Sequence, residues 1–224
     1  MRTFIKYCGI TRAEDAVLAE RLGVDYLGLV FVPSSPRCVT IEQARAIISA
    51  TRSVKVVGVF DDSEPERPNR LAAELGLDYV QLHGPPDPEL CRRVAAPVIQ
   101  AFQGAPPLDE LRRFVADRAV GSDCRKPVEI AAGSARSASY FLIDKRKGEE
   151  HADLDAVAAI PAHLREWMFL AGGLDPDNVR RAVERARPFA VDCARGIEFG
   201  PGVTDHAKMS LFIENLRHKI PGTF

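Results

Sequence analysis

The first strand-like run of the chain, Phe4-Ile5-Lys6-Tyr7-Cys8, and the sixth, Tyr140-Phe141-Leu142-Ile143-Asp144, each end on a reactive side chain. Side chains alternate across a strand, so Lys6 and Cys8 share one face of the first run. If both strands line one barrel, the Cys8 thiol and the Asp144 carboxyl meet at its C-terminal rim, where such barrels place their active sites. A thiol and a carboxyl that face each other can move protons in both directions, which favours an isomerase over a hydrolase.

Strand-like and helix-like segments alternate eight times along the chain. The strand candidates are short apolar runs, as expected of parallel strands that are buried on both faces. They cover residues 4–8, 26–31, 54–60, 78–83, 98–102, 139–144, 166–171 and 189–193. Eight βα units predict a single α/β domain over residues 1–224, folded as a closed (β/α)8 TIM barrel. A doubly wound open sheet is the alternative, and the lack of a GxGxxG motif or P-loop after the first run disfavours it.

Amphipathic stretches lie between the strand candidates and predict the helices. Residues 13–22, 41–50 and 176–186 carry apolar side chains at helical spacing. Plausible starts of the first, second, seventh and last helices are Thr11, Thr40 with Gln43, Asp175-Pro176 and Thr204-Asp205. Residues 119–138 break the regular rhythm, and we interpret them as an extended connection before the sixth strand.

Composition narrows the setting in which the protein works. A net charge of -1 over 224 residues argues against a nucleic-acid partner or a membrane surface, and a hydrophobic share of 46% is enough for a full core. The five cysteines are widely spaced without a CxxC motif, which supports neither a disulfide framework nor a zinc site. The chain enters a strand at once and has no apolar run of membrane-spanning length, so we expect a cytoplasmic protein.

Short motifs at the strand ends, taken in order, resemble the phosphoribosylanthranilate isomerase family of tryptophan biosynthesis. The resemblance runs from Lys6 to the final helix near Leu216. The motifs are Lys6-Tyr7-Cys8-Gly9-Ile10-Thr11, Phe31-Val32-Pro33-Ser34-Ser35-Pro36-Arg37, Val57-Gly58-Val59-Phe60, Val80-Gln81-Leu82-His83-Gly84, Leu170-Ala171-Gly172-Gly173-Leu174-Asp175-Pro176-Asp177-Asn178-Val179 and Val191-Asp192.

The resemblance implies an Amadori rearrangement of N-(5′-phosphoribosyl)anthranilate to the 1-deoxyribulose phosphate isomer. It implies Cys8 as the base and Asp144 as the acid, and a small-molecule substrate handled by a monomer or homodimer. No cofactor or metal is expected, because the substrate nitrogen is the electron sink. The base needs a thiol pKa below its ordinary value of about 8.5, and the acid needs a carboxyl pKa above about 4. A nearby positive charge and burial, respectively, could produce these shifts.

The same resemblance suggests the binding residues. The forked guanidinium of Arg37 suits bidentate pairing with the anthranilate carboxylate. Gly172 and Gly173 free backbone N–H groups at a helix start, as phosphate binding requires, and the loop after strand eight adds Arg195 and Gly196. The remaining polar lining of the barrel consists of Gln81, His83 and Asp192.

Two departures from the family pattern leave other functions open. Ala194 and Arg195 stand where the family has two small hydroxyl residues, so a large cation joins the phosphate site. After Asp144 the family has a glycine-rich loop, whereas this chain has a shorter, charged stretch over residues 145–154. One alternative is therefore a diverged paralogue that acts on or binds another phosphorylated sugar or aromatic acid. The other is a non-catalytic sensor or scaffold barrel.

Overall fold

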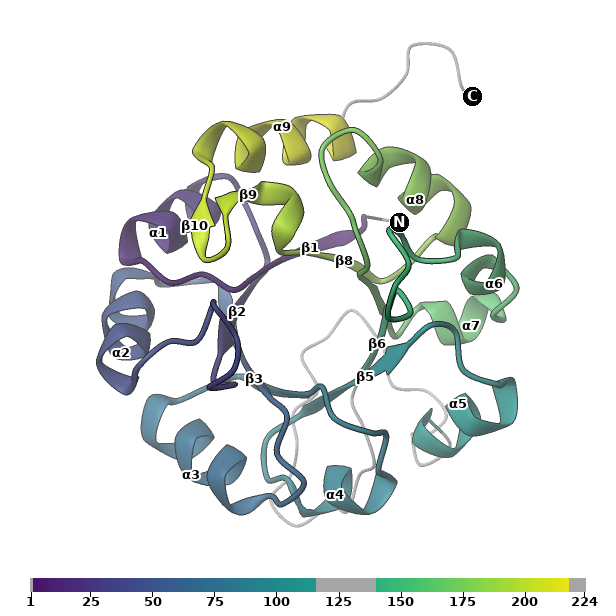
Figure 1. The fold of residues 1–224 in the computed structure, drawn as a ribbon, viewed down its shortest axis with the longest axis horizontal. Helices are drawn as coiled ribbons and strands as arrows, with labels where there is room; N and C mark the ends of the chain where they lie inside the picture. Colours follow the sequence, from purple (N-terminus) through teal and green to yellow (C-terminus); the bar gives the residue numbers. More distant parts are fainter. Residues whose placement is uncertain (1, 116–139, 218–224) are drawn as a thin grey trace.

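Eight parallel strands close into a barrel in the computed structural model, which describes residues 2–115 and 140–217 (Figure 1). Each strand pairs with the next, and β8 returns to pair with β1. The strands are β1 Phe4–Cys8, β2 Tyr26–Val30, β3 Lys55–Phe60, β4 Tyr79–Leu82, β5 Val98–Gln103, β6 Tyr140–Asp144, β7 Met168–Leu170 and β8 Ala190–Cys193. The predicted barrel is confirmed, and the predicted connection over residues 119–138 lies outside the described residues.

Helices surround the barrel as an outer ring (Figure 1). Short elements η1 Arg195–Ile197, β9 Glu198–Gly200 and β10 Val203–Thr204 follow β8, and β9 pairs with β10 as an antiparallel hairpin. The helices are α1 Ala13–Arg21, α2 Ile41–Ala50, α3 Glu66–Leu75, α4 Pro88–Arg93, α5 Leu108–Val115, α6 Leu154–Ala158, α7 Ala162–Arg165, α8 Val179–Ala186 and α9 His206–Arg217.

Two predicted helix starts are correct in detail and one is displaced. Thr40 and Gln43 form a complete capping box at α2. The Asp205 carboxylate accepts hydrogen bonds from two amides in the first turn of α9, at 2.9 and 3.1 Å. By contrast, α8 begins at Val179 and not at Pro176, because the Asp175 carboxylate accepts the amides of the next two non-proline residues and forms a turn first.

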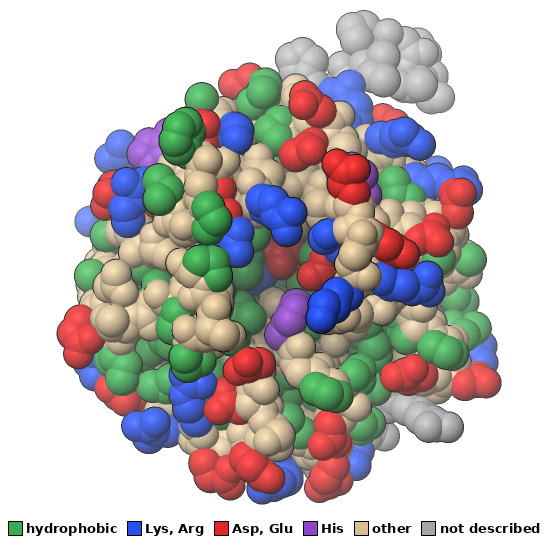
Figure 2. Space-filling model, in the orientation of Figure 1, with side chains coloured by type: hydrophobic (Ala, Val, Ile, Leu, Met, Phe, Trp, Pro, Cys, Tyr) green, Lys and Arg blue, Asp and Glu red, His purple; other side chains and the backbone are tan. Residues whose placement is uncertain are grey.

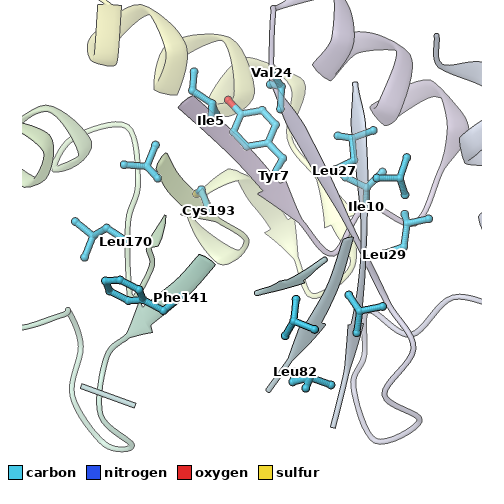
Figure 3. Packing of buried hydrophobic residues seen from close by; sticks show 14 of the residues in the cluster. Ile5, Tyr7, Ile10, Val24, Leu27, Leu29, Leu82, Phe141, Leu170 and Cys193 are labelled. Atoms are coloured by element: carbon cyan, nitrogen blue, oxygen red, sulfur yellow. The ribbon is translucent and has the colours of Figure 1, made fainter. Parts of the chain in front are cut away.

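The barrel separates two apolar cores. Outward-facing strand residues such as Tyr7, Leu27 and Phe141 pack beneath the helices (Figure 3). Tyr7 is fully buried there, and its hydroxyl donates to the Met209 carbonyl of α9 at 2.7 Å. Inside the barrel, aromatic rings fill the N-terminal half with edge-on contacts, and this second core includes Tyr26, Tyr79, Tyr140, Phe169 and Phe189. This aromatic floor leaves polar chemistry to the opposite end.

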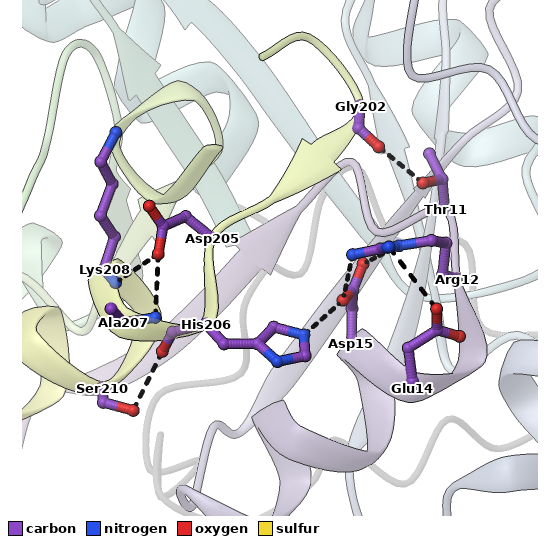
Figure 4. Close-up of polar contacts among 10 residues, drawn as sticks. All are labelled: Thr11, Arg12, Glu14, Asp15, Gly202, Asp205, His206, Ala207, Lys208 and Ser210. Carbon is purple, nitrogen blue, oxygen red and sulfur yellow. Dashed lines mark hydrogen bonds and ion pairs between the residues drawn. The ribbon is translucent and has the colours of Figure 1, made fainter. Parts of the chain in front are cut away.

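A polar clasp joins the last helix to the first (Figure 4). Asp15 of α1 is fully buried, accepts both forks of the Arg12 guanidinium at 2.8 and 2.9 Å, and contacts Nε2 of His206 at 2.7 Å. The prediction that Thr11 caps α1 is wrong, because its hydroxyl donates instead to the Gly202 carbonyl of the β9–β10 hairpin at 2.7 Å. The Thr11 contact therefore ties this hairpin to the segment that precedes α1.

None of the helices in the described part of the chain is long and apolar enough to cross a membrane.

Candidate active site

A cavity of about 470 Å³ opens at the C-terminal ends of the strands. Figure 2 shows the hollow over the middle of the barrel, with Lys and Arg side chains gathered along part of its edge. All ten residues predicted for the site line this one cavity: Cys8, Arg37, Gln81, His83, Asp144, Gly172, Gly173, Asp192, Arg195 and Gly196. A larger cavity of about 650 Å³ lies outside the barrel between α6 and α8 and shares only Gly172 with the predicted set.

Beneath Cys8 lies a buried ion pair. Lys6 is fully buried on the inward face of β1 and stands in register with Asp192 of the neighbouring strand β8. Its ammonium donates to Asp192 Oδ1 at 2.9 Å, and its positive charge lowers the pKa of the neighbouring Cys8 thiol. The base candidate therefore stands directly above a cation and an anion that the barrel holds together.

Burial raises the pKa of the Cys8 thiol to about 11. Lys6 and, more weakly, Arg37 oppose this rise, and the negative charge of Asp192 adds to it. The base role requires a lowered thiol pKa, whereas in the protein without substrate burial outweighs the nearby cations and raises it. Burial also raises the pKa of Asp192, and the negative charge of Asp144 adds to that rise while Lys6 opposes it.

Asp144 ends β6 at the same rim. Its carboxylate accepts a hydrogen bond from the backbone amide of Lys145 at 2.8 Å. The basic side chains that follow it in sequence are held within their own loop: the Lys145 ammonium donates to the Glu149 carbonyl, and the Arg146 guanidinium lies 3.9 Å from the Glu149 carboxylate. The charged loop therefore folds on itself at the edge of the cavity.

Arg37 is already paired. Its Nε and Nη2 donate to the two carboxylate oxygens of Glu198 at 2.6 and 2.5 Å, and Glu198 is only 5% exposed. The Arg37 stem crosses Gly9, whose φ is +82°, and a Cβ there would collide with Arg37 Cδ. Nη1 and the second hydrogen of Nη2 remain for a ligand, so the guanidinium can present its end to the cavity while Glu198 holds its side.

The loop after β6 lies against the predicted phosphate glycines. The Ala152 amide donates to the Gly172 carbonyl at 3.0 Å, and a Cβ on Gly172 would be 2.5 Å from the Lys145 nitrogen. Gly172 and Gly173 have φ of +93° and +73°, which favours glycine at both. Their amides have no hydrogen-bond partner within residues 2–115 and 140–217. They are therefore free to receive an anion.

Beside these glycines, the loop after β8 contributes one cation. The Arg195 side chain is exposed and has no ion-pair partner in the described part of the chain. The Gly196 amide lowers the pKa of the buried Cys193 thiol, against the larger effect of burial, which raises it. Among the described residues, the phosphate end thus offers two unpaired glycine amides and one unpaired guanidinium.

Gln81 lies on the inward face of β4 and His83 directly follows the strand, and both line the cavity. Gln81 is 2% exposed, and its Oε1 has no hydrogen-bond partner among the described residues. A buried, unpaired acceptor that faces a cavity is suited to a ligand hydroxyl or amine. No group of three or more His, Cys, Asp or Glu side chains in the described ranges is arranged to hold a metal ion.

Two residues of this arrangement were not predicted from the sequence. Lys6 had a usable signal, because a charged residue in the middle of an apolar strand needs a buried partner. Glu198 had none, since it lies far from Arg37 in the chain.

Comparison with known proteins places this geometry in a family. The sequence model of the family described as N-(5'phosphoribosyl)anthranilate (PRA) isomerase matches residues 5–215. The N-(5'-phosphoribosyl)anthranilate isomerase of Halorhodospira halophila is 37% identical over 219 residues, which is 95% of this chain and 96% of the relative. Both matches extend over nearly the whole barrel.

Solved structures of phosphoribosylanthranilate isomerases have the same fold as this chain. A monomeric form of the dimeric phosphoribosylanthranilate isomerase from Thermotoga maritima has a TM-score of 0.75 and 33% identity, covering 96% of this chain and 99% of that one. A phosphoribosyl anthranilate isomerase in complex with reduced 1-(o-carboxyphenylamino)-1-deoxyribulose 5-phosphate has a TM-score of 0.73 and 34% identity, with the same coverage. The chain therefore belongs to the phosphoribosylanthranilate isomerase family, whose members catalyse an isomerisation.

Proposed function

We propose that Cys8 and Asp144 carry out the Amadori rearrangement of N-(5′-phosphoribosyl)anthranilate, Cys8 as the base and Asp144 as the acid. One observation carries the assignment: the thiol of β1 and the carboxyl of β6 line the same cavity at the C-terminal rim, together with the other eight predicted residues. This is the end of the barrel at which enzymes of this fold react with their substrates.

The chemistry requires one proton to be donated and another to be removed. Asp144 gives a proton to the ring oxygen of the ribose, the C1–O bond breaks, and the substrate nitrogen supplies the electron pair that forms an iminium. The Cys8 thiolate then takes the proton from C2, and the electrons of that C–H bond flow into the iminium to give an aminoenol. The aminoenol tautomerises to the 1-deoxyribulose product. The substrate nitrogen supplies an electron pair in the ring opening and takes it back when the C2 proton leaves, so no cofactor is required.

Substrate recognition divides between two ends of the cavity. The free edge of the Arg37 guanidinium suits the anthranilate carboxylate, because Glu198 leaves Nη1 and half of Nη2 available. The unpartnered amides of Gly172 and Gly173, with the exposed cation of Arg195, suit the phosphate. Between them, polar side chains face the sugar, namely Gln81, His83 and Asp192.

The wider setting follows from the same assignment. The substrate is a small phosphosugar-anthranilate, and we expect neither a nucleic-acid nor a membrane partner, in line with the net charge of -1. We also expect one barrel domain over residues 1–224 that works in the cytoplasm as a monomer or homodimer. The relative from Thermotoga maritima is itself a dimeric enzyme in its natural form. Light scattering on the purified protein measures the oligomeric state.

Complementation of a tryptophan auxotroph that lacks this isomerase tests the function. The unaltered chain should restore growth without tryptophan, whereas Cys8→Ala and Asp144→Asn should not. Cys91→Ala is the matched control, because Cys91 is a buried thiol on α4 outside the cavity, and it should restore growth. Growth supported by Cys8→Ala would remove Cys8 from the mechanism, and failure of the folded, unaltered chain would exclude the reaction.

A further inference from the structure

Lys6 is a buried cation in the barrel interior, above the aromatic floor, and it takes no direct part in the rearrangement described above. Its side chain is 0% exposed on the inward face of β1, one inward position below Cys8. The ammonium is 2.9 Å from Asp192 Oδ1, and Lys6 and Cys8 occupy successive inward positions of the same strand, so that each charge acts on the other. The three groups therefore lie next to one another, from β8 through the interior to the thiol at the rim.

A buried charge at this position is costly for the fold alone. Desolvation of an ammonium and a carboxylate commonly exceeds the attraction between them, and well-packed apolar residues would serve stability equally well or better. The layer below shows that this barrel can fill its interior with apolar groups, since aromatic rings such as Tyr26 and Phe169 occupy it. The position of the ammonium under a thiol therefore points to chemistry and not to packing.

We propose that Lys6 is a positioning residue for the isomerisation, whose buried ammonium stabilises Cys8 as a thiolate, and that Asp192 limits how much of this charge acts on the sulfur. This inference rests on the proposed role of Cys8 as the base. It assigns to Asp192 a function beyond contact with the substrate, namely to keep the Lys6 side chain ionised in the interior.

The charges around the thiol are consistent with this role. Cys8 is faced by Lys6 and Arg37, which favour the thiolate, and by Asp192, which disfavours it, with Lys6 as the largest of the three influences. Burial alone would lower the pKa of Lys6, but Asp192 and Cys8 outweigh it and the pKa is raised, so the ammonium persists at neutral pH. Asp192 is faced in turn by Lys6, Asp144 and His83.

The test is the pH dependence of Cys8 alkylation by iodoacetamide in the full-length protein, measured on the Cys8 peptide by mass spectrometry. Only the thiolate reacts, so the midpoint reports the ionisation of Cys8 without substrate. In Lys6→Met the midpoint should rise by one pH unit or more, which is about tenfold less thiolate at a given pH below it. Exposed Cys38 is the internal control, and its midpoint should not change.

Lys6→Met leaves Asp192 buried without its cation, which destabilises the fold. A second variant therefore removes both charges, so that the test can be made on a folded protein. The double variant Lys6→Met with Asp192→Asn removes both charges and keeps both shapes. Its midpoint should also rise, by less than in the single variant, because the opposing charge of Asp192 disappears as well. A midpoint that stays the same or falls in the folded double variant, as judged by circular dichroism, overturns the proposal.

The result is separable from the proposed function. If the midpoint rises but Cys8→Ala retains normal turnover, Lys6 controls the thiol and the base has been assigned wrongly. If Cys8→Ala is inactive but the midpoint does not move, the base is correct and the role of Lys6 is wrong.

Discussion

Arg37 and Glu198 form a bidentate ion pair at the mouth of the barrel, with Nε–Oε1 and Nη2–Oε2 distances of 2.6 and 2.5 Å. Glu198 belongs to the β9–β10 hairpin, where its Oε1 also accepts the Gly202 amide at 3.1 Å. The hairpin therefore holds the guanidinium by its side and leaves its end free. Arg37 is 21% exposed, so this pair is fixed in position but still accessible to a ligand.

Changes at this pair should affect binding more than turnover. Arg37→Met should weaken binding of a carboxylated substrate analogue by about 2–5 kcal/mol, the cost of truncating one partner of a buried charge pair. Glu198→Ala should raise KM about tenfold with little change in kcat, because the guanidinium loses its fixed orientation and uniform binding energy is lost. Steady-state kinetics and calorimetry measure both effects.

The control for this prediction is Arg45→Met, which breaks an Arg–Glu pair with Glu74 on the outer surface. Its KM should equal that of the unaltered protein. If Arg37→Met weakens the binding of a bare sugar phosphate as much as the binding of a carboxylated ligand, then Arg37 contacts the phosphate or affects only the fold.

Loss of the base should abolish turnover without unfolding the protein. Cys8→Ala should lower kcat by about two to four orders of magnitude, whereas its free energy of unfolding should change by only about 1 kcal/mol. Asp144→Asn should lower kcat in the same range, because an amide keeps the shape but has no proton to give at neutral pH. Fluorescence-detected turnover and urea unfolding separate the two quantities, and near-normal kcat in either variant contradicts its assigned role.

Phosphate binding should depend on the backbone conformation of Gly173 and on the positive charge of Arg195. Gly173→Ala should weaken binding of inorganic phosphate and lower stability, since φ is +73° there and the new Cβ would meet the Glu150 carbonyl. Arg195→Ala should weaken the binding of inorganic phosphate about three- to tenfold, the range for an exposed charge-assisted hydrogen bond. Arg181→Ala, an exposed arginine of α8 outside this cavity, serves as the control.

A crystal grown at high phosphate provides the structural counterpart of that prediction. An anion held by the Gly172 and Gly173 amides, with Arg195 within hydrogen-bond distance, is the expected result. A pocket that stays empty under these conditions would falsify the phosphate assignment.

Replacement of Gln81 by an apolar residue should weaken substrate binding without destabilising the fold. Its Oε1 is buried without a partner, so Gln81→Leu should keep or raise the free energy of unfolding by up to about 1 kcal/mol. The same variant should raise KM about tenfold, because a substrate donor loses its acceptor. Gln100→Leu is the contrasting control: Gln100 is 1% exposed and hydrogen bonded to the Leu82 and Ala101 carbonyls, so its replacement should destabilise the fold instead. A large loss of stability in Gln81→Leu would count against this view.

Protonation of Glu20 at low pH should lower the free energy of unfolding. Hydrogen bonds from the Ser53 and Arg52 amides lower the pKa of Glu20 to about 2 from an unfolded value of 4.5. A carboxyl with a depressed folded pKa stabilises above its unfolded pKa, and this contribution disappears as pH falls from about 4.5 to 2. Glu20→Gln should therefore cost about 1–2 kcal/mol at pH 7 and nothing near pH 2, as measured by denaturant unfolding at several pH values.

Glu89→Gln is the control for the acid prediction, because Glu89 forms an exposed ion pair with Arg92 one turn along α4. A difference between Glu20→Gln and the unaltered protein that persists at pH 2 would rule out the carboxylate as its source.

Much of the barrel could be predicted because its signals are local. Each strand candidate was a short apolar run, and all eight strands form within two residues of the expected bounds. The rim position of Cys8 and Asp144 also followed locally, since side chains alternate along a strand and parallel strands end at one edge. The capping box at Thr40 required only residues within one helical turn.

Local patterns in the chain therefore set the element order, the barrel and the side chains that face its mouth. The pairing of distant residues follows from the closed fold instead: Lys6 with Asp192 across the β1–β8 closure, Arg37 with Glu198, and Thr11 with the hairpin in place of α1. These partners lie far apart in the chain, and no periodicity links them. The electrostatic state of Cys8 was equally undetermined, because burial and three surrounding charges set its pKa together.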